Sequence, residues 1–242
     1  STPVLYGIEN GDIRAENIEL TPQGISYRAV SSDVTYRISS PLAGSFNVYN
    51  TLAAVCVGRT LGLTKEQIEQ GIVSLRSVEG RMVTVDEGQP FGVIIDYAHT
   101  PDSFEKLFKD IRPMVQGKLI VMFGSAGRRD EAKRAVQGRL AAEYADEVVI
   151  TEEDDRDCDG LAILEDLAAG AEKAGKKRGE NLFLVHDRAQ AIDFALSRAL
   201  SPDDTVLLLG KGHEKTIERV NGENPWDELG TAKDALRSIL SK

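Results

Sequence analysis

The chain has 242 residues, of which 41% are hydrophobic and 28% charged, a composition typical of a globular protein and not of a disordered or fibrous one. Its formal charge of −10 argues against a general nucleic-acid or anionic-membrane binder, because both of those partners attract positive charge. No apolar run reaches the roughly 20 residues that a membrane-spanning helix needs. Two isolated cysteines and the lack of a signal-like start predict a cytoplasmic protein.

The first part of the chain predicts a β-rich segment followed by two helices. Alternating Ile, Tyr, Val and Thr predict strands at residues 13–20, 24–31 and 33–39. Helical periodicity follows at residues 46–61. Thr64 and Gln67 have the spacing of a capping box, which would open a second helix reaching about residue 75.

From about residue 82 the pattern changes. Residues 82–86 and 91–95 predict a hairpin. Short apolar runs then alternate with amphipathic segments, with strands expected at 93–96, 118–123, 147–150, 182–185 and 205–209 and helices at 103–115, 130–145, 161–174 and 188–200. A hairpin near Asn221 and Gly222 and a helix at 231–240 complete the chain. This alternation predicts an α/β fold with a mostly parallel sheet covered on both faces. We place the domain boundary between residues 79 and 80.

Polar residues follow each predicted strand, where ligands of open α/β sheets bind. The three histidines of the chain, His99, His186 and His213, all fall at such strand ends. Residues 124–127 have the glycines of a phosphate cradle, and the arginines after them can bind carboxylate or phosphate. The acidic run 152–155 is followed by an arginine, a combination that could bind a zwitterion. Solvation of ordinary loops is the alternative explanation.

Other chemistries find little support. The sequence has no His or Cys spacing typical of a metal site, so we expect no metal ligands in this chain. It also lacks the nucleophile elbow of hydrolases and the glycine fingerprint of dinucleotide-binding enzymes. Cys158 lies in an acidic loop, which disfavours a nucleophilic thiolate.

Two strand-end motifs carry a resemblance to a known family. They are Asp96-Tyr-Ala-His-Thr-Pro-Asp102 and Gly210-Lys-Gly-His-Glu214, supported by residues 44–50, 79–82, 123–134 and 151–156. In order and spacing they resemble the Mur ligases, ATP-dependent amide-forming enzymes of peptidoglycan assembly, and the resemblance runs from about residue 4 to residue 240. It is strongest to the branch that adds the third stem-peptide residue to UDP-N-acetylmuramoyl-dipeptide through an acyl phosphate.

The resemblance implies the end of a central ATPase domain at residues 1–79 and a Rossmann-like C-terminal domain at residues 80–242. The family's phosphate loop, Mg²⁺-binding carboxylate and modified lysine do not occur in this sequence. We therefore expect a piece of a longer enzyme that uses ATP and Mg²⁺ and is inactive alone. Its implied partners are ATP, the UDP-sugar dipeptide and an amino acid.

The resemblance also implies roles for individual residues. Arg81 would be catalytic and reach the γ-phosphate. ATP would contact Asn47, Asn50, Asp96, Tyr97 and His99, with Asp96 on the ribose hydroxyls. The amino acid would contact Arg129, Lys133, Asp154, Arg156, Gly210 and Glu214, with Arg129 on its carboxylate and Glu214 on its ammonium group.

The specificity loop departs from the family pattern. The diaminopimelate-adding branch carries D-N-P-R where this chain has Glu153-Asp154-Asp155-Arg156. The arginine favours a substrate with a distal carboxylate, whereas the acids favour a distal ammonium group, as in lysine or ornithine. The sequence therefore leaves open which amino acid the enzyme adds. Two other functions remain as alternatives: another amino-acid ligase of the polyglutamate type, and a non-catalytic binding module.

Overall fold

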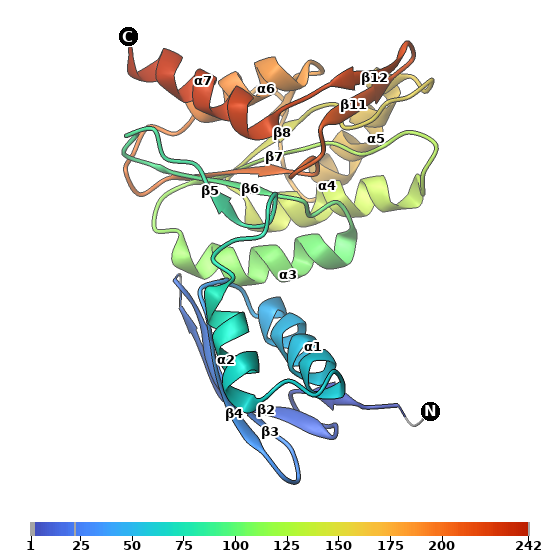
Figure 1. Cartoon of the computed structure of the whole chain (residues 1–242). Coiled ribbons are helices and arrows are strands. Elements are labelled where there is room, and N and C mark those ends of the chain that lie inside the picture. Colours follow the sequence, from blue (N-terminus) through green and yellow to red (C-terminus); the bar gives the residue numbers. More distant parts are fainter. Residues whose placement is uncertain (1–2, 22, 242) are drawn as a thin grey trace. The chain divides into compact units, whose positions relative to one another are not determined.

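A computed structural model describes residues 3–21 and 23–241 (Figure 1). The chain divides into two compact units, one ending at Val78 and one beginning at Glu79, and each is described by itself. The division lies one residue before the boundary expected from the sequence. Over the described ranges, none of the helices combines the length and apolar character that crossing a bilayer requires.

The first unit is a four-stranded sheet covered by two helices. Its elements are β1 (Tyr6–Gly7), β2 (Ile13–Thr21), β3 (Gly24–Val30), β4 (Thr35–Ser40), α1 (Phe46–Thr60) and α2 (Lys65–Ser74). The strands follow one another in chain order, with β1 parallel to β2 and the others antiparallel. Leu52 of α1 and Ile68 of α2 share a core with Tyr27 of β3, so both helices pack on the same face of the sheet. Thr64 and Gln67 form the predicted capping box.

The second unit is built on a six-stranded sheet of order β5-β6-β10-β7-β8-β9. The strands are β5 (Val83–Thr84), β6 (Gly92–Asp96), β7 (Leu119–Phe123), β8 (Glu147–Ile150), β9 (Leu182–Leu184) and β10 (Thr205–Leu209). Only β5 runs antiparallel, against β6. A separate hairpin joins β11 (Thr216–Arg219) to β12 (Gly222–Pro225). The predicted α/β class with a mostly parallel sheet is confirmed.

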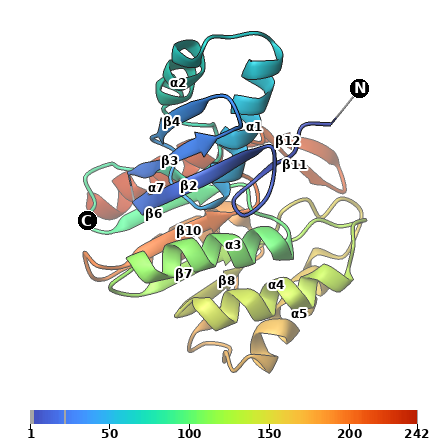
Figure 2. The same cartoon turned by 90° about the horizontal axis from the view of Figure 1, so that it is seen from below.

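Helices cover both faces of this sheet. They are α3 (Pro101–Ile111), α4 (Ala132–Tyr144), α5 (Gly160–Lys173), α6 (Arg188–Ser197) and α7 (Glu228–Leu240). Helices α3, α4 and α5 lie side by side on one face (Figure 2), and α6 and α7 cover the other. Successive residues of β7 point to opposite cores, Val121 to the first and Met122 to the second. Burial on both faces explains why the strands read as continuous apolar runs.

Several element ends differ from the sequence expectation, and side-chain caps explain them. Helix α3 starts at Pro101 because the hydroxyl of Thr100 accepts from the amide of Ser103 at 3.2 Å, a capping box that the sequence reading overlooked. Helix α7 starts three residues early because Asp227 caps it through the amide of Gly230 at 3.0 Å. Strand β1 was not predicted, since two residues carry no periodicity.

Candidate functional site

The loops that follow β6, β7, β8 and β10 enclose a hollow of about 320 Å³ at the carboxyl edge of the parallel sheet. Its lining consists of Tyr97, His99, Thr100, Ala126, Arg129, Asp130, Lys133, Glu153, Asp154, Arg156 and Glu214. The structure thus brings together most residues named for the amino acid and two of those named for ATP. What each of them binds stays a prediction.

Two cations of this hollow are available for an anionic ligand. Arg129 is exposed, and Lys133 donates to the carbonyl oxygen of His99 at 3.1 Å. Among residues 3–21 and 23–241, no carboxylate forms an ion pair with either side chain. Gln137 donates to the same His99 carbonyl at 3.1 Å and so helps to hold the loop after β6 against α4. An unpaired guanidinium beside an ammonium group suits a carboxylate or a phosphate.

Glu153 is the one carboxylate of the lining that is both buried and unengaged within the described residues. It is 6% exposed, and its Oε2 has no hydrogen-bond partner there. Burial raises the pKa of Glu153, although the positive charges of Lys133 and Arg188 oppose the shift. Gly210, with φ +104°, lies against it, and a Cβ there would come within 3.0 Å of Oε2. A buried acceptor without a donor is suited to receive a cationic group or a hydrogen-bond donor from a ligand.

The sequence reading treated residues 152–155 as one acidic run and did not single out Glu153. Glu153 follows β8 by three positions and comes to face Gly210, whereas Glu152 is held by Arg219 at 2.6 and 2.8 Å. Of these two adjacent acids, Glu152 is paired and Glu153 is not, and counting the charges in the sequence cannot tell which one is paired.

Lys211 holds two of the predicted amino-acid ligands and was also missed. Its side chain is 1% exposed, and its Nζ lies 3.0 Å from Oδ1 of Asp154 and 2.7 Å from Oε2 of Glu214. The hydroxyl of Tyr97 donates to the other oxygen of Glu214 at 3.1 Å. Asp154 and Glu214 are thus oriented and partly neutralised from behind the hollow. The glycines that flank Lys211 were a visible signal, because both adopt positive φ.

Arg156 is engaged by the β11–β12 hairpin. Its Nε donates to Oε2 of Glu218 at 2.7 Å, its amide donates to the carbonyl of Glu218 at 2.9 Å, and its Nη1 donates to the carbonyl of Gly127. The hydrogen bond to Glu218 raises the pKa of Arg156, so the guanidinium stays charged. This arginine is therefore paired, in contrast to Arg129.

His186 belongs to a different cluster and is not part of the lining. Its Nε2 lies 2.6 Å from Oδ2 of Asp155, and ligand atoms of Glu152, Asp155 and His186 all lie within 4.8 Å of one another. The sequence reading expected no metal ligands in this chain. Arg219 binds both oxygens of Glu152, whereas Oδ1 of Asp155 is buried and has no hydrogen-bond partner within the described residues. Asp187 caps α6 by accepting from the amide of Gln190 at 2.9 Å.

A cationic and aromatic group stands beside the hollow. The guanidinium of Arg81 lies 4.7 Å from the centre of the Tyr97 ring, whose other neighbours are the rings of His99 at 4.8 Å and His213 at 5.1 Å. Arg81 is exposed and has no ion pair within the described residues. His213 was not among the predicted site residues. A guanidinium without an ion pair next to these tilted aromatic rings fits a phosphate-bearing heterocycle such as ATP.

Asp96 is 5% exposed and already engaged by the backbone. Its Oδ2 accepts from the amide of Met82 at 2.9 Å and its Oδ1 from the amide of Ala98 at 2.8 Å. Burial raises the pKa of Asp96, and these two hydrogen bonds oppose the shift. Through its hydrogen bond to Met82, this carboxylate fixes the segment that carries Arg81. Each oxygen keeps a further lone pair, so the ribose contact stays a prediction.

The two asparagines named for ATP lie in the first unit, at the start of α1. The side-chain Nδ2 of Asn47 donates to the carbonyl of Ala43 at 2.7 Å, and the side-chain Nδ2 of Asn50 donates to Oδ1 of Asn47 at 2.9 Å. Asn47 is buried and steadies the helix start, whereas Asn50 is exposed. Asn50 is therefore the better placed of the two for a ligand.

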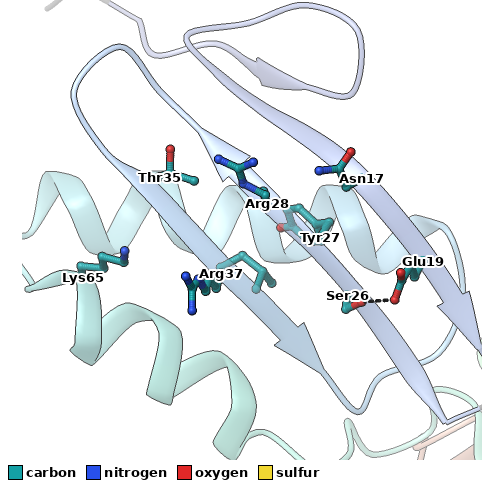
Figure 3. A pocket seen from close by; sticks show the side chains of 9 residues that line it. Asn17, Glu19, Ser26, Tyr27, Arg28, Thr35, Arg37 and Lys65 are labelled. Atoms are coloured by element: carbon teal, nitrogen blue, oxygen red, sulfur yellow. Dashed lines mark hydrogen bonds between the residues drawn. The ribbon is translucent and has the colours of Figure 1, made fainter.

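A hollow of about 620 Å³ lies on the sheet of the first unit and was not predicted. Figure 3 shows Asn17, Arg28 and Thr35 on its three neighbouring strands and Lys65 at the start of α2. Ser26 donates to Glu19 across it at 3.1 Å. It holds none of the strand-end residues discussed above. Volume alone is therefore a poor guide to the chemistry here.

Comparison with known proteins decides the family. The sequence model of the Mur ligase glutamate ligase domain matches residues 80–212, which is more than half of the chain. The chain belongs to the Mur ligase family. The model of the Mur ligase middle domain matches residues 1–58.

Curated relatives lie within the same family. A UDP-N-acetylmuramyl-tripeptide synthetase of Roseiflexus is 44% identical over 95% of this chain and 45% of its own length. A diaminopimelate ligase of Bacillus licheniformis is 39% identical over 97% of this chain and 47% of its own length. The chain thus spans about half the length of the curated Mur ligases that it matches.

Solved structures agree on the fold. A UDP-N-acetylmuramoyl-L-alanyl-D-glutamate–2,6-diaminopimelate ligase superposes with a TM-score of 0.62 at 27% identity, over 98% of this chain and 48% of that one. A folylpolyglutamate synthase of Mycobacterium tuberculosis superposes with a TM-score of 0.67 at 16% identity, over 98% and 49%. The second likeness shows the fold alone.

Proposed function

We propose that this chain is the amino-acid-binding part of a cytoplasmic, ATP-dependent Mur ligase that adds an amino acid to UDP-N-acetylmuramoyl-dipeptide during peptidoglycan synthesis. One observation carries the proposal: a single hollow holds two unpaired cations, Arg129 and Lys133, and one buried, unpaired carboxylate, Glu153. An amino acid presents the complementary charges, a carboxylate and an ammonium group.

In this proposal Arg129 and Lys133 hold the α-carboxylate of the incoming amino acid, and Glu153 receives its ammonium group. Amide formation needs the neutral amine, because the protonated form has no lone pair to attack with. The pKa of Glu153 is raised by burial, which makes its carboxylate a stronger base than an exposed one. Glu153 is thus suited to take the amine proton as well as to bind it.

The phosphate groups of ATP would lie near the guanidinium of Arg81. Its base would lie against the aromatic rings of Tyr97, His99 and His213. ATP would transfer its γ-phosphoryl group to the carboxylate of the peptide substrate and leave as ADP, and the amine would then attack the resulting acyl phosphate and release phosphate. The Mg²⁺ ligands are expected outside this chain. The share of these residues is orientation and charge neutralisation, the main sources of catalysis in phosphoryl transfer.

The test is phosphate release by the full-length protein with ATP, UDP-N-acetylmuramoyl-dipeptide and a panel of lysine, ornithine, diaminopimelate, alanine and glutamate. We expect release that depends on both the dipeptide and one amino acid. Arg129→Gln should raise the KM for that amino acid at least tenfold. Arg128→Gln is the matched control, because Arg128 lies next to it, points to Asp157 and is not in the lining. Release without any amino-acid dependence would overturn the proposal.

A polyglutamate-type ligase is the second candidate, favoured only by the shared fold of the folylpolyglutamate synthase. It requires a folate or peptide acceptor and glutamate as the added residue. The same assay separates the two, since turnover with a folate acceptor and none with the UDP-sugar dipeptide would support the second candidate. A non-catalytic module would show no turnover with either acceptor.

A further inference from the structure

We propose that Glu218 on β11 is a positioning residue for amino-acid specificity. By pairing with Arg156 it withdraws that guanidinium from the ligand, so that the site selects an amino acid whose side chain ends in an ammonium group over one that ends in a carboxylate. This inference rests on the proposed function and goes beyond it, because it assigns a role to the β11–β12 hairpin and a class to the substrate.

Glu218 makes three bonds to the loop after β8, and together they fix the loop rather than merely touch it. Its carboxylate accepts from Nε of Arg156 at 2.7 Å, and its carbonyl accepts from the Arg156 amide at 2.9 Å. Its own amide donates to Oδ1 of Asp154 at 2.8 Å. One residue of the hairpin therefore both pairs with the charge of Arg156 and fixes the direction of Asp154.

The charge balance of the hollow follows from these contacts. Arg156 is neutralised by Glu218, so it offers little net attraction to a second carboxylate. Asp154 and Glu214 share the single ammonium of Lys211, which leaves one negative charge in excess. Glu153 is matched by the α-ammonium group of the ligand. The two positive charges of Arg129 and Lys133 are balanced in number by the α-carboxylate and by Asp130, which also lines the hollow. The excess negative charge of Asp154 and Glu214 therefore remains, and it repels a distal carboxylate.

Removing the Glu218 charge should invert part of this preference. Arg156 lines the hollow and is only 16% exposed, so a guanidinium released from Glu218 would stay close to the ligand. A free, partly desolvated guanidinium binds carboxylate through two parallel hydrogen bonds. Arg156 would then attract a distal carboxylate of the ligand, which it does not attract while it is paired with Glu218.

The experiment compares two pairs of amino acids that match in carbon count and differ at the distal end: lysine against 2-aminoadipate, and ornithine against glutamate. Phosphate release by the full-length protein gives kcat/KM for each. We expect the wild type to prefer the ammonium-ended member at least tenfold. Glu218→Gln should reduce that ratio at least tenfold, mainly through a lower KM for the carboxylate-ended member.

Glu223→Gln is the matched control, because Glu223 is exposed and pairs directly across the hairpin with Glu218. It should leave the ratio unchanged. Glu218→Asp keeps the charge and should keep the preference. The double variant Glu218→Gln with Arg156→Gln should lose the gain for 2-aminoadipate, and it reports on the role of Arg156 even where the single variant folds poorly.

Three results separate the possible failures. Equal losses for both members of each pair in Glu218→Gln would mean that Glu218 only supports the fold, and the inference would be wrong. A wild type that prefers the carboxylate-ended member would overturn the inference and leave the proposed function intact. A wild type that uses no amino acid at all would overturn the proposed function itself.

Discussion

The buried ammonium of Lys211 lies 3.0 Å from Oδ1 of Asp154 and so joins the loop after β10 to the loop after β8. The same ammonium holds Glu214 at 2.7 Å. The two loops that flank the candidate amino-acid site are thus tied through one side chain that the ligand does not need to touch.

Lys211→Met should therefore weaken both the site and the fold. Removing one partner of a buried pair leaves uncompensated charge, which costs about 3–5 kcal/mol. We expect lower thermal stability of the full-length protein and an increase of at least tenfold in the KM for the amino acid. Lys215→Met, which breaks the exposed pair with Glu79, is the control and should change neither. An unchanged KM would show that Asp154 and Glu214 keep their positions without Lys211.

Glu153→Gln should stabilise the protein while impairing its function. Burial raises the native pKa of Glu153, so the native state holds this proton more firmly than the unfolded state. Stability is therefore lost as pH rises from the ordinary carboxyl range through the raised native pKa. The free energy of unfolding of the variant should exceed that of the wild type by roughly 1–3 kcal/mol at about pH 8 and by little at about pH 4. A pH-independent gain would rule out titration of Glu153 as its cause.

The α4–α5 contact should not tolerate a methyl group at Gly138. A Cβ there would lie 1.9 Å from the carbonyl oxygen of Leu167, and Gly170 meets Ala135 in the same way. Gly138→Ala must push the helices apart, at a cost of about 1–3 kcal/mol. In Gly71→Ala the new methyl group meets nothing within 4 Å, so that control should gain about 0.5–1 kcal/mol from helix propensity. Thermal melting of the full-length proteins gives both values.

Arg188→Met should be among the most damaging substitutions in the second unit. The guanidinium is fully buried, pairs with both oxygens of Glu228 at 2.7 and 2.8 Å, and donates to the carbonyls of Glu152 and Leu209. The single variant should lose about 3–5 kcal/mol. Adding Glu228→Met should recover part of that loss. A double variant no more stable than the single one would show that the carbonyl contacts matter more than the ion pair.

Most of the second unit could be predicted from the sequence because its strands are buried on both faces and its helices on one. Val121 and Met122 occupy opposite cores, and strands that are buried on both faces are continuous apolar runs in the sequence. The capping box at Thr64 was readable because Gln67 is a common partner, whereas the Ser103 partner of Thr100 is not. Strand β1 was beyond reach, since its two residues form a strand only through their parallel pairing with β2.

The sequence predicted where the candidate site lies, but not which of its charged side chains form ion pairs with one another. The strand-end rule located Arg129 and Glu214, and the structure puts both in one hollow. Which charges cancel depends on contacts between distant segments. Arg156 meets Glu218 across 62 positions of the chain, and no local pattern reveals that pairing. Glu153 was overlooked for the same reason, because its isolation is a property of the folded loops.

The single tryptophan of the chain gives these contacts an optical readout. The indole of Trp226 donates to Oε2 of Glu228 at 2.7 Å, the carboxylate that holds Arg188, and Arg188 in turn binds the carbonyl of Glu152 beside the hollow. A ligand that shifts the loop after β8 would pull on this chain of bonds and change the environment of the indole. Within this chain, occupancy of the hollow could therefore be followed by intrinsic fluorescence, without a label and without turnover.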